Sequence, residues 1–397
     1  MKPLDRFIEY AKIDTQADDT TGTSPSTEKQ KNLGVLLVKQ LKELGLDDAY
    51  MDEYGIVYAH LCGEGDRIGF NAHIDTALEV TNTGTNPQVH ENYNGEEIIL
   101  NDLYKLSPKQ FPSLNNHIGH TLVTTDGNTL LGADDKAGIA IIMSALEYLQ
   151  THKEIKHHNL SIAFTCDEEI GQGPDHFDLE KMKADYAFTI DGSDIDCIDY
   201  ENFNAQEITV HVKGVSVHPG EGKNALINAL LIINEFINMF PKNETPYDAN
   251  EDEGYWHIND IQGSSAECEL TMIIRDFDKV KIDQRAKDIE GYIAKLQSKY
   301  PKAIIELTIK KQYENMKPYV EKDPRPLEVA KRALIKNGLT PKSTKIRGGT
   351  DGATFSKMGL VTPNLGTGSY NHHGRYEYLD VQEFEKMIDV VIDIMRL

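Results

Sequence analysis

Histidine and acidic residues follow apolar segments at several points of this sequence, and the first case is His73-Ile74-Asp75. The run of small and largely apolar residues 68–72 precedes it, as at the end of a buried strand. Residues i and i+2 of a strand point to the same side, so His73 and Asp75 face one site. The imidazole can bind a metal ion while the carboxylate orients it, as in many zinc sites. A partly buried histidine that pairs with a neighbouring aspartate is the alternative, and the pair alone does not decide between them.

Four further groups of ligand-type residues stand at comparable positions. With the first pair they are His73/Asp75, Asp134/Asp135, Glu168/Glu169, Asp191 and His372/His373. Imidazole and carboxylate donors without cysteine suit Zn²⁺, Co²⁺ or Mn²⁺. So many carboxylates exceed the needs of one ion, and without metal their mutual repulsion would be costly. Two ions bridged by one carboxylate explain the excess. Each group taken singly could equally be a helix cap or a solvated strand end.

The elements that must position these residues alternate along the chain. Helices are predicted over residues 3–11, 26–44 and 137–149, and strands over 56–61, 67–73, 121–125, 161–165 and 186–190. This alternation predicts an α/β fold with a mixed, largely parallel sheet flanked by helices. Ligands of such sheets bind at the carboxyl ends of the strands, where the acidic residues and His73 stand. Residues 77–120 are polar and irregular, a length typical of a lid or binding loop.

The pattern changes near residue 205. Strands are predicted over 207–212, 268–274 and 303–309, and helices over 224–239 and 280–298. The strands alternate as if one sheet face were solvated, which indicates a separate small domain. We therefore predict a catalytic domain over residues 1–205, an inserted smaller α+β domain over 206–320, and completion of the first domain by 321–397.

Composition restricts the classes of function. The chain has 397 residues, of which 39% are hydrophobic and 26% charged, and its formal net charge is −23. Such an acidic chain is not expected to bind nucleic acid, whose phosphates require a basic face. It has no run of about 18 apolar residues that would span a membrane. The start lacks the apolar core of a signal peptide, and the 4 cysteines are scattered without metal or disulfide spacing. We expect a cytoplasmic protein.

The order of the motifs resembles the M20 family of dinuclear zinc peptidases. The likeness rests on H-x-D at 73–75, G-A-D-D-K-A-G at 132–138, D-E-E-I-G at 167–171, I-D-G at 190–192 and N-x-H-G at 371–374. Segments 121–127, 131–140, 274–278 and 347–352 resemble the tripeptide-cleaving aminopeptidases within that family. The likeness extends over essentially the whole chain, including the insert. It implies a zinc-exopeptidase-like domain and a metallo-aminopeptidase that releases the N-terminal residue from tripeptides.

The resemblance also implies the metal ligands. His73 and Asp191 would hold one zinc ion, Glu169 and His373 the other, and Asp134 would bridge the two. Co²⁺ or Mn²⁺ could substitute for zinc.

Two of these choices are made between neighbours. Asp134 is preferred to Asp135 because the bridging aspartate of the family directly follows a small residue. His373 is preferred to His372 because the family's ligand directly precedes glycine.

Catalytic roles carry over in the same way. Asp75 would orient His73, and Glu168 would act as the general base that takes a proton from water and returns it to the departing amine. His218, in Val217-His218-Pro219-Gly220, would help to stabilise the oxyanion, from its own subunit or a partner subunit. A loop histidine before proline is the alternative for His218.

Substrate-binding residues are expected in and beyond the insert. Arg275 and Arg347 are candidates to hold the C-terminal carboxylate of the peptide, since a planar guanidinium suits bidentate pairing. A structural ion pair is the alternative for both arginines, and Arg275 directly precedes Asp276. Asn204 is a candidate for the substrate N-terminus or backbone. A carboxylate clamp at a fixed distance from the metals would favour very short peptides.

Two rival functions follow from the same residues. Another M20 hydrolase, such as a dipeptidase, carboxypeptidase or N-acyl amino acid deacylase, would share the architecture and the metals but differ in the clamp. A non-catalytic relative that acts as a binding module would have lost the base or a ligand, yet Glu168 and each ligand position are filled. The expected partner is a short peptide, and the family resemblance also makes a homodimer an expectation.

Overall fold

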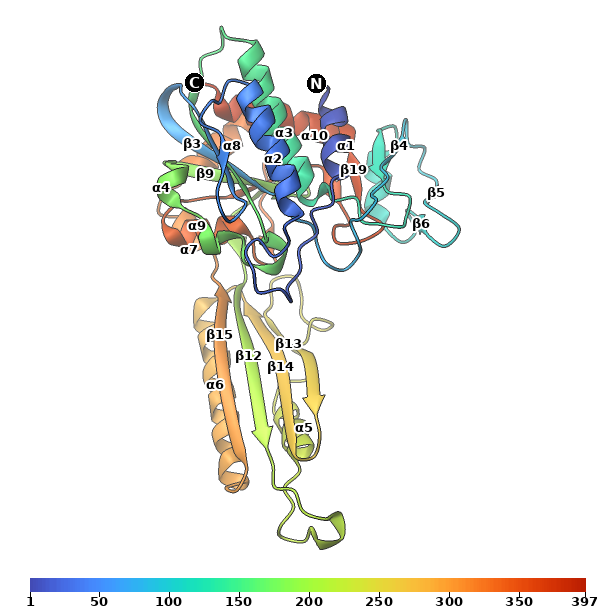
Figure 1. Ribbon diagram of the computed structural model, residues 1–397, viewed down its shortest axis with the longest axis vertical. Coiled ribbons are helices and arrows are strands. Elements are labelled where there is room, and N and C mark those ends of the chain that lie inside the picture. Colours follow the sequence, from blue (N-terminus) through green and yellow to red (C-terminus); the bar gives the residue numbers. More distant parts are fainter. The chain divides into compact units, whose positions relative to one another are not determined.

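The computed structural model describes residues 1–397, which form two units (Figure 1). Unit 1 contains Met1–Tyr200, Pro318–Thr344 and Thr350–Leu397, and unit 2 contains Glu201–Lys317 and Lys345–Gly349. The predicted boundaries at 205/206 and 320/321 therefore differ from those of the structure by a few residues. The return of Lys345–Gly349 to unit 2 was not predicted. Its cause is a pairing between distant residues, because β16 (Lys345–Ile346) lies parallel to β11 (Glu201–Asn202).

The main sheet of unit 1 has seven strands in the order β1-β2-β8-β3-β9-β17-β10. Their bounds are Tyr50–Met51, Val57–Leu61, His158–Thr165, Glu64–His73, Tyr186–Gly192, Asn364–Gly366 and Ile198–Asp199. The central strands β8, β3, β9 and β17 are parallel to one another, and the edge strands β1, β2 and β10 are antiparallel. The predicted α/β class with a mixed sheet is confirmed, and parallel pairing is confined to the centre.

Helix α3 (Ala133–Thr151) covers β3 and β9 and is itself flanked by α1 (Pro3–Ala11) and α10 (Val381–Met395) (Figure 1). Its packing on the sheet is very close at Gly138. A Cβ atom there would lie 1.9 Å from the carbonyl oxygen of Ile190 on β9, so only glycine fits. The other helices of unit 1 are α2 (Gln30–Glu43), α4 (Leu179–Met182), α8 (Arg325–Lys336) and α9 (Asp351–Met358), and α7 (Lys317–Val320) spans the unit boundary.

Helix α2 begins later than the sequence predicted. The predicted start at Ser26 is wrong because Ser26 makes other bonds: its backbone N–H and its hydroxyl donate to Asp167, at 2.7 and 2.5 Å. Gln30 also donates to the Asp167 carboxylate, at 2.6 Å. These contacts tie the segment before α2 to the turn that carries Glu168.

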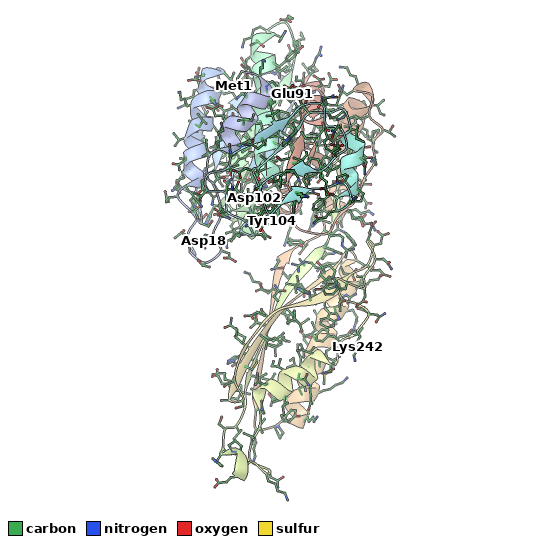
Figure 2. The ribbon with its side chains drawn as sticks, turned by 90° about the vertical axis from the view of Figure 1, so that its right-hand side faces the viewer. Met1, Asp18, Glu91, Asp102, Tyr104 and Lys242 are labelled. Atoms are coloured by element: carbon green, nitrogen blue, oxygen red, sulfur yellow. The ribbon has the colours of Figure 1, made fainter.

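The region 77–120 is more ordered than the irregular loop that was predicted. It contains β4 (Gln88–His90), which joins a four-stranded antiparallel sheet in the order β18-β19-β7-β4. The partners are β18 (Ser369–Tyr370), β19 (Tyr378–Asp380) and β7 (Leu122–Thr124). A hairpin of β5 (Ile98–Ile99) and β6 (Lys105–Leu106) follows, and its turn carries Asp102 and Tyr104 (Figure 2). Buried Tyr93, Leu106 and Leu114 give the region a local core.

Unit 2 is built on a four-stranded antiparallel sheet in the order β13-β14-β12-β15. The strands are Tyr255–Gly263, Glu267–Asp276, Asn204–Lys213 and Ile304–Tyr313, and the helices α5 (Ala229–Ile237) and α6 (Lys279–Lys299) pack against the sheet. Strand β13 was not predicted. Helix α5 is shorter than the predicted 224–239 because Ile227 pairs with Val215 and Asn228 caps the helix through its side chain.

No helix of the structure has the length and apolar character needed to cross a membrane.

Asp380 makes a buried polar centre at the start of α10. Its Oδ2 lies 2.8 Å from Nδ1 of His117 and 2.6 Å from Nδ1 of His120, and its Oδ1 accepts the backbone N–H of Glu383 at 3.0 Å. Burial raises the pKa of this carboxyl, but the bonds from His117, Glu383 and His120 outweigh it, so the pKa lies below its ordinary value. The charged form therefore stabilises the fold.

We expect Asp380→Asn to lower the free energy of unfolding at pH 7 by about 2 kcal/mol, since two bonds to a charged acceptor are weakened. Stability from a lowered carboxyl pKa is complete above roughly pH 5 and is lost as the pH falls through the folded-state pKa. The difference between wild type and variant should therefore shrink below about pH 4. Chemical denaturation followed by circular dichroism from pH 7 to pH 3 measures it.

Asparagine is as good a helix cap as aspartate, so Asp380→Ala is the matched control and should cost about 1 kcal/mol more. A difference between Asp380→Asn and wild type that stays constant with pH would contradict this account.

Candidate active site

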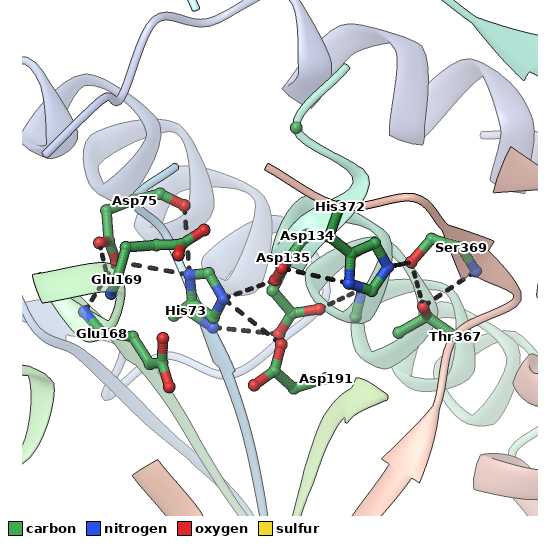
Figure 3. Close-up of polar contacts among 12 residues, drawn as sticks. His73, Asp75, Asp134, Asp135, Glu168, Glu169, Asp191, Thr367, Ser369 and His372 are labelled. Carbon is green, nitrogen blue, oxygen red and sulfur yellow. Dashed lines mark hydrogen bonds and ion pairs between the residues drawn. The ribbon is translucent and has the colours of Figure 1, made fainter. Parts of the chain in front are cut away.

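The carboxyl ends of the central parallel strands place the candidate residues at one edge of the sheet (Figure 3). His73 is the last residue of β3 and pairs with Thr165, the last residue of β8. The chain turns directly after β8 into Glu168 and Glu169, and Asp191 lies near the end of β9. Parallel strands end on the same side, so topology alone brings these residues together.

Buried Asp75 contacts both His73 and the turn that carries Glu168 and Glu169. Nδ1 of His73 lies 3.2 Å from the carbonyl oxygen and 3.4 Å from the Oδ1 of Asp75. A carbonyl oxygen only accepts, so Nδ1 carries a hydrogen, and in the neutral ring Nε2 then has the lone pair that a metal-binding histidine requires. The Asp75 carboxylate also accepts the backbone N–H groups of Glu168 and Glu169, each at 3.1 Å. One carboxylate therefore positions both a histidine and the acidic turn.

Asp134 stands in a sharply turned segment at the start of α3. Gly132 has a φ of 72°, which suits glycine, and Asp134 is not helical although the helix continues after it. The buried carboxylate of Glu377 accepts the backbone N–H groups of Leu131, Gly132 and Asp134, at 2.8, 2.8 and 3.0 Å. Sequence reasoning missed Glu377. It lies more than two hundred residues away in the chain and no local motif marks it.

The two carboxylate oxygens of Asp134 face two separate groups of ligand atoms. Its Oδ1 lies 2.9 Å from Nε2 of His73, which is also 3.4 Å from Oδ1 of Asp191. Its Oδ2 lies 3.3 Å from Nε2 of His373, which is also 3.0 Å from Oε2 of Glu169. Within each trio the ligand atoms lie within 4.8 Å of one another. This is the arrangement expected of a carboxylate shared between two cation sites.

The electrostatics of the site favour bound cations. Burial and the nearby Asp134 raise the pKa of Glu169 to about 7. Burial, opposed by His73, raises the pKa of Asp191 to about 6. The Oε1 atom of Glu169 is buried without a hydrogen-bond partner. An unsatisfied buried carboxylate oxygen is costly, and a divalent cation would satisfy it. The donor set therefore fits divalent metal ions.

Glu168 lies on the same turn as Glu169 but serves neither trio. Burial, together with the charge of Asp191, raises the pKa of Glu168 well above its ordinary value, although His73 opposes the shift. Its backbone N–H is held by Asp75 at 3.1 Å. A carboxyl with a raised pKa is suited to general acid–base chemistry near neutral pH.

Asp135 and His372, the sequence neighbours of Asp134 and His373, each make hydrogen bonds outside the two trios. The carboxylate of Asp135 accepts the backbone N–H groups of His73 and Gly138, at 3.2 and 3.1 Å. Nδ1 of His372 lies 3.3 Å from Oδ2 of Asp134, but its Nε2 is bonded to the Ser369 hydroxyl at 2.9 Å (Figure 3). Asp135 is thus turned toward the backbone, and His372 contacts Asp134 from the side away from Glu169.

The predicted substrate-binding arginines lie in unit 2. Arg275 is 8% exposed, donates to backbone carbonyl oxygens and stacks on the ring of Tyr313 at 5.3 Å. Arg347 stacks on Phe203 at 5.3 Å and donates to the backbone oxygen of Asn250 at 2.7 Å. Each guanidinium keeps further N–H donors, so these contacts hold the planes in place without exhausting them.

Asn204 and His218 also belong to unit 2. The Asn204 amide donates to the backbone oxygens of Asp276 and Phe277 and accepts the N–H of Asn315, at 3.0–3.1 Å. Both polar atoms of this side chain are therefore used within unit 2. His218 is exposed, and its Nδ1 accepts the N–H of Gly220 at 3.2 Å.

Comparison with known sequences shows which protein family the chain resembles. Residues 119–397 match the model of Peptidase family M20/M25/M40. The chain is 46% identical to peptidase T of Clostridium perfringens (strain 13 / Type A) over 100% of its length and 98% of that protein. It is 47% identical to peptidase T of Shouchella clausii (strain KSM-K16), with coverage of 99% and 97%.

Solved structures show the same fold. Aminopeptidase PepT from Bacillus cereus superposes with a TM-score of 0.79 at 21% identity, covering 99% of this chain and 97% of that one. A tripeptidase from Staphylococcus aureus gives 0.80 at 20% identity with the same coverage. A dinuclear metal-binding M20 peptidase from Bacillus subtilis gives 0.66 at 13% identity, covering 99% and 96%.

Proposed function

This chain belongs to peptidase family M20/M25/M40 and is similar over its whole length to proteins named peptidase T, and on that premise we propose that it is an aminopeptidase that releases the N-terminal residue from tripeptides. The observation that carries the proposal is the position of Asp134, whose two oxygens face two histidine–carboxylate groups. The described function of the structurally similar Staphylococcus aureus tripeptidase supports the substrate class.

We propose two zinc ions as cofactors, for which Co²⁺ or Mn²⁺ can substitute. His73 and Asp191 would hold one ion, Glu169 and His373 the other, and Asp134 both, in keeping with the two trios. Ions bound by these residues would polarise a scissile carbonyl and lower the pKa of a water molecule.

Glu168 moves the proton in this proposal. Its carboxylate accepts a proton from the attacking water and passes it to the nitrogen of the departing amine. The raised pKa supports both halves of that transfer near neutral pH. Asp75 contributes by holding the backbone of Glu168 and the ring of His73 in one arrangement.

The candidates for the oxyanion and for the C-terminal carboxylate of the peptide lie in unit 2. His218 would stabilise the oxyanion, and Arg275 and Arg347 would bind the C-terminal carboxylate through guanidinium N–H groups. Their aromatic supports favour a fixed orientation for that purpose. The internal bonds of Asn204 favour a structural role, and its contact with the substrate stays a prediction.

Other M20 hydrolases remain the alternative class, because a dipeptidase, carboxypeptidase or N-acyl amino acid deacylase would use the same metals. A non-catalytic binding module is disfavoured by the complete set of ligands and base. A homodimer and a cytoplasmic location stay predictions.

The substrate class is tested with Ala-Ala-Ala and its N-acetylated form, using metal-loaded protein. We expect release of free alanine and Ala-Ala from the first and no cleavage of the second, because an aminopeptidase requires a free N-terminus. Dipeptide and tetrapeptide turnover should be slower, since a clamp at a fixed distance selects for length. Mass spectrometry of the products checks this. Preferred cleavage of the acetylated peptide would instead indicate a deacylase or carboxypeptidase.

A further inference from the structure

Glu79 lies beside the candidate metal centre but belongs to neither trio. Its Oε1 is 3.6 Å from Nδ1 of His373, and its side chain is 60% exposed. The opposite nitrogen of the same ring, Nε2, faces Asp134 and Glu169. Glu79 therefore borders the outer side of a ring whose inner side belongs to the metal centre. At 3.6 Å the contact is longer than a hydrogen bond, so the carboxylate is available to a ligand.

The backbone that carries Glu79 is held firmly. Nε2 of Gln16 donates to the carbonyl oxygens of Ala77 and Val80, each at 3.0 Å, on either side of Glu79. Ala77 and Val80 also pack with Leu130 in a small buried cluster. Leu78 and Glu79 are the exposed residues between buried Ala77 and Val80, so the Glu79 carboxylate reaches solvent from a segment whose backbone is fixed, which is the condition for a preorganised contact.

The next turn of the same loop is anchored to buried groups. Oδ1 of Asn82 accepts the N–H of Thr15 at 3.1 Å and the Nζ of Lys136 at 3.0 Å. Lys136 is itself fully buried and also donates to the carbonyl oxygen of Ile13 at 2.7 Å. The loop is thus fastened on both sides of Glu79.

Three other carboxylates around the trios are already engaged. Asp75, Asp135 and Glu377 are buried and each accepts backbone N–H groups. Glu79 differs from them because it is exposed and its one ion-pair contact, with Nδ1 of His373, is long at 3.6 Å. A peptide with a free N-terminus brings an ammonium group to within one residue of the bond that is cut, and this group requires an anionic acceptor next to the metal centre.

We propose that Glu79 binds the α-ammonium group of the substrate peptide and so makes the site specific for free N-termini. This inference rests on the proposed aminopeptidase function and adds the residue that recognises the amine. Glu79 acts on the substrate directly, by charge and hydrogen bonding, rather than through His373.

The test combines Glu79→Gln with a substrate analogue that lacks the amine. Metal-loaded wild type and variant are compared by kcat/KM on Ala-Ala-Ala and by the inhibition constant of N-propanoyl-Ala-Ala, a competitive inhibitor in which the first residue is replaced by its des-amino form. We expect Glu79→Gln to lower kcat/KM on Ala-Ala-Ala about tenfold or more, mainly through a higher KM, because a charge-assisted bond is lost. The inhibition constant of the des-amino peptide should be equal for the two proteins, because it has no ammonium group for Glu79 to bind. Metal content, measured by atomic emission after dialysis, should be unchanged.

Glu91→Gln is the matched control, since it neutralises another exposed acidic residue of unit 1 and should match wild type in each measurement (Figure 2). An equal loss of affinity for both peptides, or loss of metal, would show that Glu79 positions His373 and would overturn the inference. So would an unchanged kcat/KM on Ala-Ala-Ala. Absence of peptide cleavage by metal-loaded wild type would refute the proposed function and the inference with it.

Discussion

Glu168→Gln is expected to lower kcat on Ala-Ala-Ala by about 10²–10⁴-fold, the usual contribution of a general base. Glutamine has the same shape but cannot take a proton from water at neutral pH. The backbone of residue 168 stays in place because its N–H is bonded to Asp75, so the change is confined to the proton-transfer group. Steady-state kinetics over a range of peptide concentrations should show the loss in kcat, with a much smaller effect on KM.

Bound metal must be measured in parallel, since Glu168 serves neither trio and the variant should retain the wild-type content. Glu180→Gln, at an exposed position of helix α4, is the control for the loss of one acidic charge. Full activity of Glu168→Gln would refute the assigned role.

Asp134→Ala should have the second large effect, because it removes an oxygen from both trios at once. We expect bound zinc to fall from about two per chain to one or fewer and peptide cleavage to fall to roughly the background rate. Atomic emission after dialysis gives the metal content. Treatment of wild type with a chelator should also abolish activity, and added Zn²⁺, Co²⁺ or Mn²⁺ should restore it in wild type but not in Asp134→Ala.

The control for Asp134→Ala is Asp194→Ala. Asp194 belongs to a second acidic group with Asp196 and Cys197, and it is exposed. If Asp134→Ala retained both ions, the shared-ligand geometry would not describe metal binding.

Sequence reasoning predicted best what is local. Three elements show this: the strand ending at His73, the strand before Glu168 and the helix after Asp134. In each, the spacing of apolar residues and a polar end are visible within about ten residues. Parallel pairing then requires those ends to meet, and the structure shows His73, Asp134, Glu169, Asp191 and His373 within contact distances.

What it missed depends on contacts between distant parts of the chain. Strand β13 follows a long polar segment and has mostly exposed residues, so its apolar pattern is weak. Segment Lys345–Gly349 belongs to unit 2 through pairing with β11. Glu377 resembles any acidic residue beside a strand until its bonds to the Asp134 turn are seen. Glu79 likewise sits in a stretch with no motif, and only the fold shows that it faces His373.

The glycine at position 138 bears on how homologous sequences are judged. An added methyl group there would collide with the carbonyl oxygen of Ile190, which directly precedes Asp191, and with the side chain of Asp135. Helix and strand would have to separate, and the spacing between Asp134 and Asp191 would change with them. A homologue with every ligand and the base intact can therefore be inactive through one small substitution beneath the site. An inventory of ligand positions alone would classify such a sequence as an enzyme, so position 138 belongs in that inventory.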